Sequence, residues 1–494
     1  MEAVAQTIMA AKRINHPMSY RNGTYYCYTG THYKTILSDE IKNFIILAPV
    51  KCGVSSRMAR NPRRHEFLVK QFEIEAGLHR GDAAEPNCTF INFPNGTLLF
   101  DEKGNRNFVS DNSQWFITYC LNYNYDPNAP HPEEWFRHLT RSGLSQEMQD
   151  LLAECFALAF YSGEIEKALY LYGQSATGKS VTLNVYRAIL GQENVALGQE
   201  NVANEDLHSL TQCDTQGAQA RANLGGKLVN ICNDTTGTLK DSGILKTLIS
   251  REPVTVKKLW KDTFSIQKYA RLVFGSNQLP RQVFSDPALL RRVVLFEFKK
   301  VISPNDMDTN YVKKITDNEL PGILNWILVG LERVIKNGSL TIPQNMVDSF
   351  EQTRIENDSV YAWLDVNDFC VGETDHIPLA KAFDDYKLFC SKNCHSSLTH
   401  NKAFATRLRE YGYTTKKLKD GQHLYFSMKN TVVTNEQQPD NQQPYQQQKP
   451  DNPQSDRQSI LNLLRQHDQA YLREVGSRDY GKNLPLVPIV NDGN

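Results

Sequence analysis

The stretch from Gly173 to Ser180 constrains the fold of this chain more than any other. It reads Gly-Gln-Ser-Ala-Thr-Gly-Lys-Ser and follows an apolar run at 168–172, so a strand leads into a loop of the pattern GxxxxGK[ST]. The glycines allow a tight turn whose backbone N–H groups point at phosphate oxygens, while Lys179 adds a positive charge and Ser180 a hydroxyl ligand for magnesium. A helical segment at 181–190 follows, with its positive end facing the phosphates. We therefore expect this loop to bind a nucleoside triphosphate with Mg²⁺. The predicted nucleotide-binding residues are Gly173, Gln174, Ser175, Ala176, Thr177, Gly178, Lys179, Ser180 and Val181.

Length and composition set limits on the class of protein. The 494 residues are enough for about three domains of roughly 150 residues each. The 55 basic and 55 acidic residues balance, so a nucleic-acid partner has to be argued from a local basic feature. Ten cysteines without regular spacing favour free thiols over a disulfide framework. No apolar run reaches the ~18 residues that a membrane-spanning helix needs, so we expect a soluble intracellular protein without a membrane partner.

The first 140 residues mix short aromatic strands with helical patterns at 39–47 and 64–78, and they contain no motif of a nucleotidyl transferase. We expect an N-terminal accessory domain at 1–140 without a primase module. Its basic cluster either contacts a phosphate backbone or is a solvated loop and helix start. That cluster is Arg57, Arg60, Arg63 and Arg64.

Polar residues follow the next apolar runs. The run at 226–232 ends on Asn233 and Asp234, where a carboxylate beside the phosphate-loop strand can hold the water shell of magnesium; the alternative is a plain turn. The run at 270–276 ends on Asn277, whose amide can orient the attacking water. Arg291 and Arg292 precede a strand at 294–298 and are suited to stabilise a phosphoryl group bound by a neighbouring subunit, unless they form surface ion pairs.

Residues 254–264 alternate like a hairpin with a turn near 261–262. Three lysines, Lys257, Lys258 and Lys261, surround Trp260 there. Lysines interleaved with an aromatic ring suit the grip of a single-stranded phosphate backbone, and a solvated hairpin without a ligand is the alternative.

Taken in chain order, these pieces resemble a known family. Residues from about 90 to 430 are similar to the helicase part of the phage, plasmid and poxvirus primase-helicases, which are superfamily-3 helicases of the AAA+ class. The matching text comprises Asn95-Gly96, Tyr125-Asp126-Pro127, Gly173 to Ser180, the strand ending at Asp234, Lys246, the lysine hairpin, Asn277 to Pro280, Arg291-Arg292, and Gly322 to Leu331.

The resemblance implies an α/β fold in which an AAA+ P-loop NTPase core follows an N-terminal mixed or helical collar domain and precedes a C-terminal winged-helix domain. It implies ATP and Mg²⁺ as cofactors, with Lys179, Asp234, Asn277, Arg291 and Arg292 as catalytic residues. Ser180 and Asp234 would hold the metal. Lys257, Lys258 and Lys261 would bind DNA in the pore of a hexameric ring that moves 3′ to 5′ along one strand.

Two departures from the family are visible. The family usually has glutamate where this chain has Asn233-Asp234, which puts the identity of the water-activating group in doubt. It tends to have Gly-Gly-Asp before the hairpin, where this chain reads Ser250-Arg251-Glu252; Glu252 matches in charge, but the backbone freedom of glycine is lost.

Boundaries follow from these assignments. The ATPase domain with its helical collar covers 141–340, including a helix at 145–161. A winged-helix-like domain covers 341–433, with helices at 380–389 and 402–411 and a terminal hairpin at 413–426 that turns at 419–422. That domain either packs or places basic residues on duplex DNA. The candidates are Lys402, Arg407, Lys416 and Lys417. The Gln-, Asn- and Pro-rich segment 434–458 predicts a disordered linker, and 459–494 a tail whose short amphipathic helix either docks to a replication partner or is idle. Cys390, Cys394 and His395 lack a second ligand pair for zinc.

The sequence thus predicts an ATP-dependent DNA helicase acting on single-stranded and forked DNA in the replication of a virus, phage or mobile element. It would work in the host cytoplasm or nucleoid, or at a viral replication site in a eukaryote. The alternative is an ATP-switched, origin-binding initiator that recruits other enzymes without processive unwinding. A scaffold with an inactive ATPase is a third reading, motivated by Asn233-Asp234.

Overall fold

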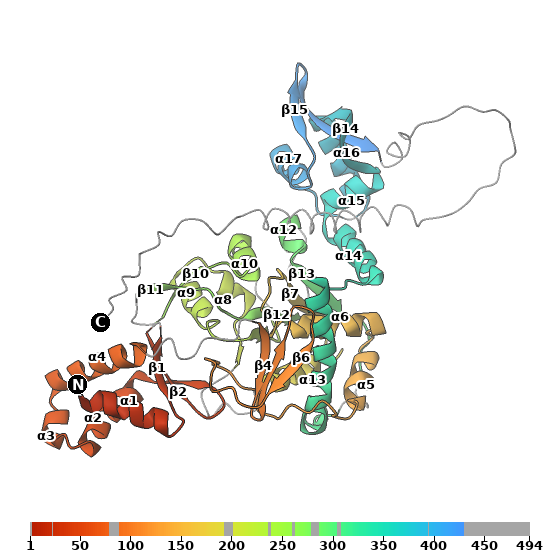
Figure 1. Cartoon of the computed structure of the whole chain (residues 1–494). Helices are drawn as coiled ribbons and strands as arrows, with labels where there is room; N and C mark the ends of the chain where they lie inside the picture. Colours follow the sequence, from red (N-terminus) through yellow and green to blue (C-terminus); the bar gives the residue numbers. More distant parts are fainter. Residues whose placement is uncertain are drawn as a thin grey trace, which may run out of the picture. The chain divides into compact units, whose positions relative to one another are not determined.

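A computed structural model describes residues 2–21, 23–78, 88–191, 201–235, 239–258, 262–277, 286–303, 308–393 and 395–428 (Figure 1). The chain divides into two units, Met1–Val432 and Val433–Asn494. The predicted linker over 434–458 and the predicted tail over 459–494 lie outside the described residues.

A five-stranded parallel sheet forms the centre of the larger unit. In spatial order its strands are β13 (Val293–Glu297), β7 (Ala168–Tyr172), β12 (Arg271–Ser276), β9 (Val229–Cys232) and β8 (Val202–Ala203). Each pair of neighbours is parallel. The strands are buried along nearly their whole length, which explains why they read as continuous apolar runs. The predicted α/β class is confirmed, and the structure shows that its central sheet is parallel. The two-residue strand β8 was too short to predict.

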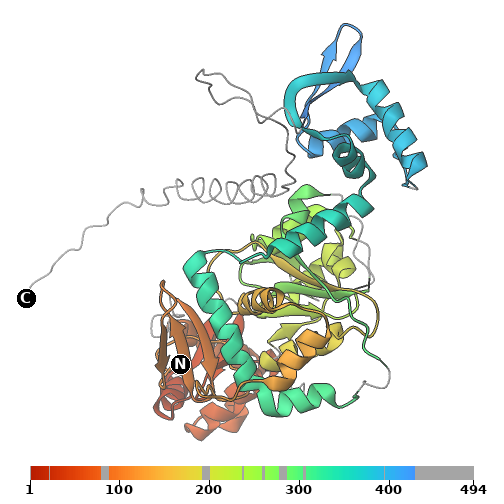
Figure 2. The same cartoon turned by 90° about the vertical axis from the view of Figure 1, so that its right-hand side faces the viewer.

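Long helices pack against this sheet (Figure 2). They are α5 (Glu133–Arg141), α6 (Gln146–Ala157), α7 (Lys179–Ile189) and α13 (Tyr311–Asn337). Ser145 caps α6 by accepting a hydrogen bond from the N–H of Met148, so the predicted helix begins as expected and ends four residues early. Helix α13 comes very close to α6, because a Cβ atom on Gly330 would lie 2.6 Å from the carbonyl carbon of Ala153.

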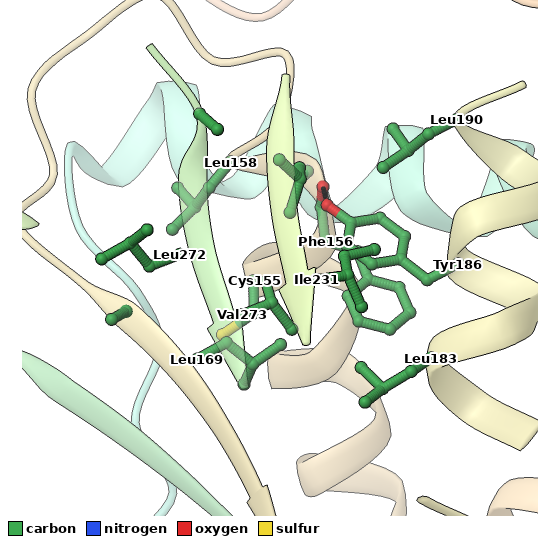
Figure 3. Packing of buried hydrophobic residues seen from close by; sticks show 14 of the residues in the cluster. Cys155, Phe156, Leu158, Leu169, Leu183, Tyr186, Leu190, Ile231, Leu272 and Val273 are labelled. Carbon is green, nitrogen blue, oxygen red and sulfur yellow. Dashed lines mark hydrogen bonds between the residues drawn. The ribbon is translucent and has the colours of Figure 1, made fainter. Parts of the chain in front are cut away.

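The core joins the sheet to α6 and α7 (Figure 3). The ring of Tyr186 in α7 stacks on that of Phe156 in α6, with centroids 3.8 Å apart and planes 4° from parallel. The Tyr186 hydroxyl donates to the carbonyl of Phe156 at 2.8 Å, so this large buried side chain has its polar atom satisfied. Leu183, Ile231 and Val273 fill the space beside the two rings.

Residues 88–140 share this core. The antiparallel sheet β4 (Thr89–Phe93), β5 (Gly96–Phe100) and β6 (Arg106–Val109) contributes Ile91 and Phe100 to the same buried cluster as the parallel sheet. The predicted accessory domain at 1–140 thus contains residues of two buried cores, and the family resemblance begins at about residue 90, close to the start of the second.

The first 78 residues have a core of their own. They form α1 (Glu2–Arg13), α2 (Ser38–Lys51), α3 (Ser56–Ala59) and α4 (Pro62–Leu78) beside the sheet β1 (Met18–Arg21), β2 (Thr24–Tyr28) and β3 (Tyr33–Ile36) (Figure 1). The buried side chains of this core are Val4, Ile8, Tyr25, Ile41, Ile45, Phe72 and Ala76.

Residues 207–357 contain further elements. They are α8 (Leu207–Thr211), α9 (Thr215–Ala222), α10 (Ser242–Ile249), α12 (Pro287–Leu290), α14 (Gln344–Asn357) and the antiparallel pair β10 (Val254–Lys257) and β11 (Thr263–Ile266).

Residues 359–428 gather around another core, drawn in blue in Figure 2. Their order is α15 (Ser359–Val366), β14 (Phe369–Pro378), α16 (Leu379–Lys392), α17 (Asn401–Glu410), β15 (Thr415–Leu418) and β16 (Gly421–Met428), with the strands arranged β14-β16-β15. The predicted helices and terminal hairpin are confirmed. Strand β14 was not predicted, because its apolar and polar residues do not alternate and most of them are exposed.

Arg407 was a predicted candidate for contact with duplex DNA, but in the structure it is a buried residue of an ion pair. It is 8% exposed, forms an ion pair with Asp358, and donates from Nη1 to Glu410 Oε2 at 2.7 Å. It therefore ties α17 to the start of α15. Of the three residues that were too few for a zinc site in the sequence, Cys390 is buried and Cys394 lies outside the described residues.

Neither a membrane span nor a cluster of metal ligands is found in the part of the chain that the structure describes. No helix there is long and apolar enough to cross a bilayer. No group of three or more His, Cys, Asp and Glu side chains there is arranged to hold a metal.

Candidate nucleotide-binding site

Three of the predicted site segments meet at one edge of the parallel sheet. The loop 173–178 follows β7, Asn277 follows β12, and Asn233-Asp234 follows β9. Because the three strands are parallel, their carboxyl ends lie at the same edge, where α/β proteins commonly bind ligands. One expectation was wrong. Asn233 and Asp234 were expected after the strand next to β7. They follow β9 instead, and β12 lies between β7 and β9 and brings Asn277 next to the loop.

The loop takes a conformation that only glycine allows at two positions. Gly173 has φ +143°, and a Cβ atom there would lie 2.3 Å from the carbonyl oxygen of Phe298. Gly178 has φ +96° at the N-cap of α7, and a Cβ atom there would lie 2.4 Å from Ser142 Oγ. Both glycines of the motif are therefore required by close packing as well as by backbone angle.

Lys179 lies inside this loop. Its Nζ donates to the carbonyl oxygens of Gly173 and Gln174, each at 2.7 Å, and to Thr177 Oγ1 at 3.3 Å. Only 7% of the residue is exposed. Burial lowers the pKa of Lys179, and the nearby carboxylate of Asp234 acts in the opposite direction. The loop thus encloses a positive charge whose present partners are mostly neutral carbonyls.

A buried histidine supports the loop from behind, and the sequence analysis did not find it. His138 in α5 is 1% exposed, and its Nε2 lies 2.9 Å from Thr182 Oγ1. Thr182 Oγ1 in turn donates to the carbonyl oxygen of Gly178 at 3.1 Å. Burial lowers the pKa of His138 to about 4, so the ring is neutral at pH 7. A lone histidine in an amphipathic helix carries no local signal for this contact.

The two residues of the predicted Asn233-Asp234 pair have different surroundings. Asp234 is exposed, whereas Asn233 donates from Nδ2 to Asn184 Oδ1 in α7 at 3.0 Å. The Oδ1 atom of Asn233 is buried and has no hydrogen-bond partner among the described residues. A buried acceptor without a partner is unusual and is available to a ligand. Asn184 is a second residue that the sequence analysis missed.

The arginine pair lies at the other edge of the sheet. Val293 pairs with Ala168, so Arg291 and Arg292 precede β13 at the amino end of β7. Arg292 forms an ion pair with Glu166 at 2.9 Å and donates to the carbonyl oxygen of Ala288 at 2.9 Å, while Arg291 is exposed. The five residues of β7 span about 16 Å at ~3.3 Å per residue, so neither arginine reaches the loop of its own chain.

The predicted lysine hairpin is confirmed as a strand pair. Lys257 in β10 pairs with Thr263 in β11, and Val256 pairs with Phe264. The Nζ of Lys258 lies 5.9 Å from the ring centroid of Phe264, which is 38% exposed. Trp260 and Lys261 lie outside the described residues.

The segment before the hairpin keeps the backbone turn that glycine would favour. Arg251 has φ +56°, and the N–H of Glu252 donates to the carbonyl of Thr247 at 3.2 Å, so helix α10 ends in a left-handed turn. The departure from Gly-Gly-Asp therefore places an arginine in a conformation that L side chains rarely adopt.

Comparison with known proteins adds a family of unknown function (DUF5906), which matches residues 171–292. Those residues run from the loop to the arginine pair. No curated protein matches.

Three solved structures are similar over most of their length. The A form apo structure of the NrS-1 C terminal region has 13% identity and a TM-score of 0.46, covering 85% of this chain and 99% of that chain. The A form of region 305–718 has 14% identity and a TM-score of 0.46, covering 86% and 99%. The apo structure of region 305–718 has 12% identity and a TM-score of 0.46, covering 87% and 99%.

Proposed function

We propose that this chain is an ATP-dependent DNA helicase with an AAA+ P-loop core, acting in the replication of a virus, phage or mobile element. The observation that carries the proposal is the meeting of the Lys179 loop, Asn277 and Asn233-Asp234 at one edge of the sheet. A loop that binds phosphate, an amide that orients water and a carboxylate for magnesium are the parts that ATP hydrolysis needs.

The residues present fit ATP and Mg²⁺. The loop would hold the phosphates through its N–H groups and Lys179, whose Nζ is already enclosed by Gly173 and Gln174. Ser180 and Asp234 are exposed at the same edge and would hold the metal, and the unpartnered Oδ1 of Asn233 is a further acceptor there. When bound, magnesium neutralises charge on the phosphates. Asn277 would position the attacking water.

The position of the arginines supports a site shared between subunits. Arg291 and Arg292 lie ~16 Å from the loop of their own chain, so they can serve only the loop of another copy. Arg291, which is exposed, would reach that neighbour, and Arg292, held by Glu166, would position it. A head-to-tail contact of this kind closes into a ring, which we take to be a hexamer.

DNA would pass the lysine hairpin. Lys257 lies in β10, and Lys258 follows it beside the exposed ring of Phe264 in β11, a combination suited to a single strand. Residues 359–428 have the helix and strand order expected of a winged-helix domain and would support the core or contact the duplex.

The test is unwinding of forked DNA by the full-length chain. The variant Lys179→Ala should abolish ATP hydrolysis and unwinding, because the charge at the phosphates is lost. Lys381→Ala, which removes an exposed lysine of α16, is the matched control and should leave both activities unchanged. Equal residual hydrolysis in wild type and Lys179→Ala would show that the loop is not catalytic and would favour a scaffold.

The second candidate is an ATP-switched, origin-binding initiator. It is favoured by the acid side of the site, where Asn233 is hydrogen-bonded to Asn184 and Asp234 alone presents a carboxylate. Such a protein would hydrolyse ATP slowly and leave the fork paired. Hydrolysis that is dependent on Lys179 but not accompanied by strand separation would therefore decide for the initiator.

A further inference from the structure

The first 78 residues carry an exposed group of arginines that the proposed ATPase does not use. We call Arg57, Arg60, Arg63 and Arg64 the arginine surface; Arg57 lies in α3, Arg60 is its C-cap, and the other two lie in the first turn of α4. All four are exposed. Residues 51–70 contain six lysines and arginines and one acid, a net charge of +5, whereas the 55 basic and 55 acidic residues of the whole chain cancel.

This charge is not neutralised within the part of the chain that the structure describes. The one acid of the segment, Glu66, pairs with Lys70 at 3.5 Å, and no described carboxylate forms an ion pair with the arginine surface. The first turn of α4 contains no acidic residue. Arg63 and Arg64 therefore face the positive end of the helix dipole, where cations are unfavourable. Arginines at this position lower the stability of the start of α4, and their presence there points to an anionic ligand.

Apolar side chains stand beside these charges. Phe67 is 55% exposed and follows Arg63 by four residues and Arg64 by three, so all three lie on one side of α4. The opposite side of the helix is buried, with Phe72 and Ala76 in the N-terminal core. An exposed phenylalanine one helical turn after two arginines combines a stacking surface with phosphate ligands.

We propose that the arginine surface and Phe67 form a second binding site for single-stranded nucleic acid, separate from the lysine hairpin. Guanidinium groups bind phosphates through paired hydrogen bonds, and a base stacks on the phenyl ring. Exposed Phe67 and Ile74 are separated by the polar side chains of Lys70 and Gln71, so no continuous apolar face exists here for a lipid surface. The site does not depend on ATP.

The experiment measures fluorescence anisotropy of labelled single-stranded DNA and RNA with the full-length chain, without nucleotide, over a range of salt concentrations. The variant Arg60→Glu/Arg63→Glu/Arg64→Glu should weaken binding at least about tenfold and reduce the slope of log K against log salt by about 2, since roughly 0.7 is lost per phosphate contact. Phe67→Ala should weaken binding about tenfold with the slope unchanged, because stacking is not screened by salt. DNA and RNA arms identify which strand is preferred.

Lys12→Glu/Arg13→Glu/Lys42→Glu is the matched control, because it makes the same change in charge elsewhere in the first 78 residues. It should leave the affinity within about twofold. Equal loss in the control and the arginine variant would overturn the proposal, since the effect would then follow net charge alone. Unchanged binding of both DNA and RNA by the arginine variant would overturn it too.

Two readouts separate this site from a structural role and from the hairpin. The melting temperature of the arginine variant should stay the same or rise, because carboxylates are favoured at the start of α4. If the melting temperature falls, a second variant, Arg60→Gln/Arg63→Gln/Arg64→Gln, must still bind nucleic acid more weakly than wild type for the proposal to stand. Lys257→Glu/Lys258→Glu tests the hairpin. Normal binding by that variant with loss in the arginine variant supports the arginine surface while contradicting the hairpin assignment.

Discussion

At the scale of the residue, His138 is a neutral side chain that supports the loop at 173–178. Its ring is hydrogen-bonded to the hydroxyl of Thr182, and that hydroxyl donates its own proton to the carbonyl oxygen of Gly178. The ring nitrogen facing Thr182 is therefore the donor. Protonation of the second nitrogen would place a charge in a buried site where no carboxylate among the described residues raises the pKa of the ring.

Acid should therefore destabilise the chain through His138. Its pKa is about 4 in the folded state against 6.5 when exposed, so the unfolded state binds more protons between these values and stability falls as pH drops from about 6.5 to about 4. The loss is about 3 kcal/mol, at ~1.4 kcal/mol per pKa unit. Chemical denaturation of wild type and His138→Gln at pH 7 and pH 4.5 measures it. Gln keeps a donor near the Nε2 position, and an unchanged difference between the two proteins across this range would contradict the assignment.

Arg251 carries a second prediction at this scale. Its φ of +56° is a left-handed conformation that glycine adopts without strain. Arg251→Gly should be about 1 kcal/mol more stable than Arg251→Ala, since both variants lose the arginine side chain and only the alanine keeps the strain. Thermal or urea unfolding of the two variants compares them directly. Equal stability would mean that the turn relaxes.

At the scale of the element, close contact between α6 and α13 fixes the helices behind the sheet. A Cβ atom on Gly330 would approach backbone atoms of Ala153 and Glu154 within 3 Å, and backbone cannot move aside as a flexible side chain does. Glu319 in α13 also accepts the N–H groups of Glu134 and Trp135, both at 2.9 Å, and so caps α5. Helix α13 thus positions α5, on which His138 lies.

Gly330→Ala should therefore destabilise the chain by about 1–3 kcal/mol, as overpacking does. Val329→Ala, one residue earlier and 45% exposed, is the control and should change stability by less than about 0.5 kcal/mol. Unfolding in urea gives both values. A neutral Gly330→Ala would show that the two helices separate without loss.

At the scale of the whole molecule, the proposed ATPase would need a second chain to complete its site, because the arginines and the loop occupy opposite edges of the sheet. Arg291→Ala should lower ATP hydrolysis at least about 10³-fold while nucleotide affinity changes little. Mixed with wild type, it should reduce activity more steeply than its share, because each variant subunit disables a neighbour. Activity in simple proportion to wild-type content would contradict the shared site. Arg292→Ala should also lower stability, because Glu166 loses its partner.

The sequence by itself determined the local features of this protein. Four local features were predicted: the loop at 173–180, the helix after Ser145, the hairpin at 254–264 and the terminal hairpin. Each depends on glycine positions, a helix cap or alternating residues, which are all visible in a short stretch of sequence. Strand β14 was missed, because its sequence shows no alternation of apolar and polar residues.

Only the tertiary structure decided which of these features meet. It placed β12 between the loop strand and the acid strand, brought His138 to Thr182 across 44 positions, joined Arg292 to Glu166 and buried Arg407 against Asp358. The physical reason is that such pairs form when distant segments share one core, and burial then selects the partner that satisfies each polar group. No local pattern contains that information.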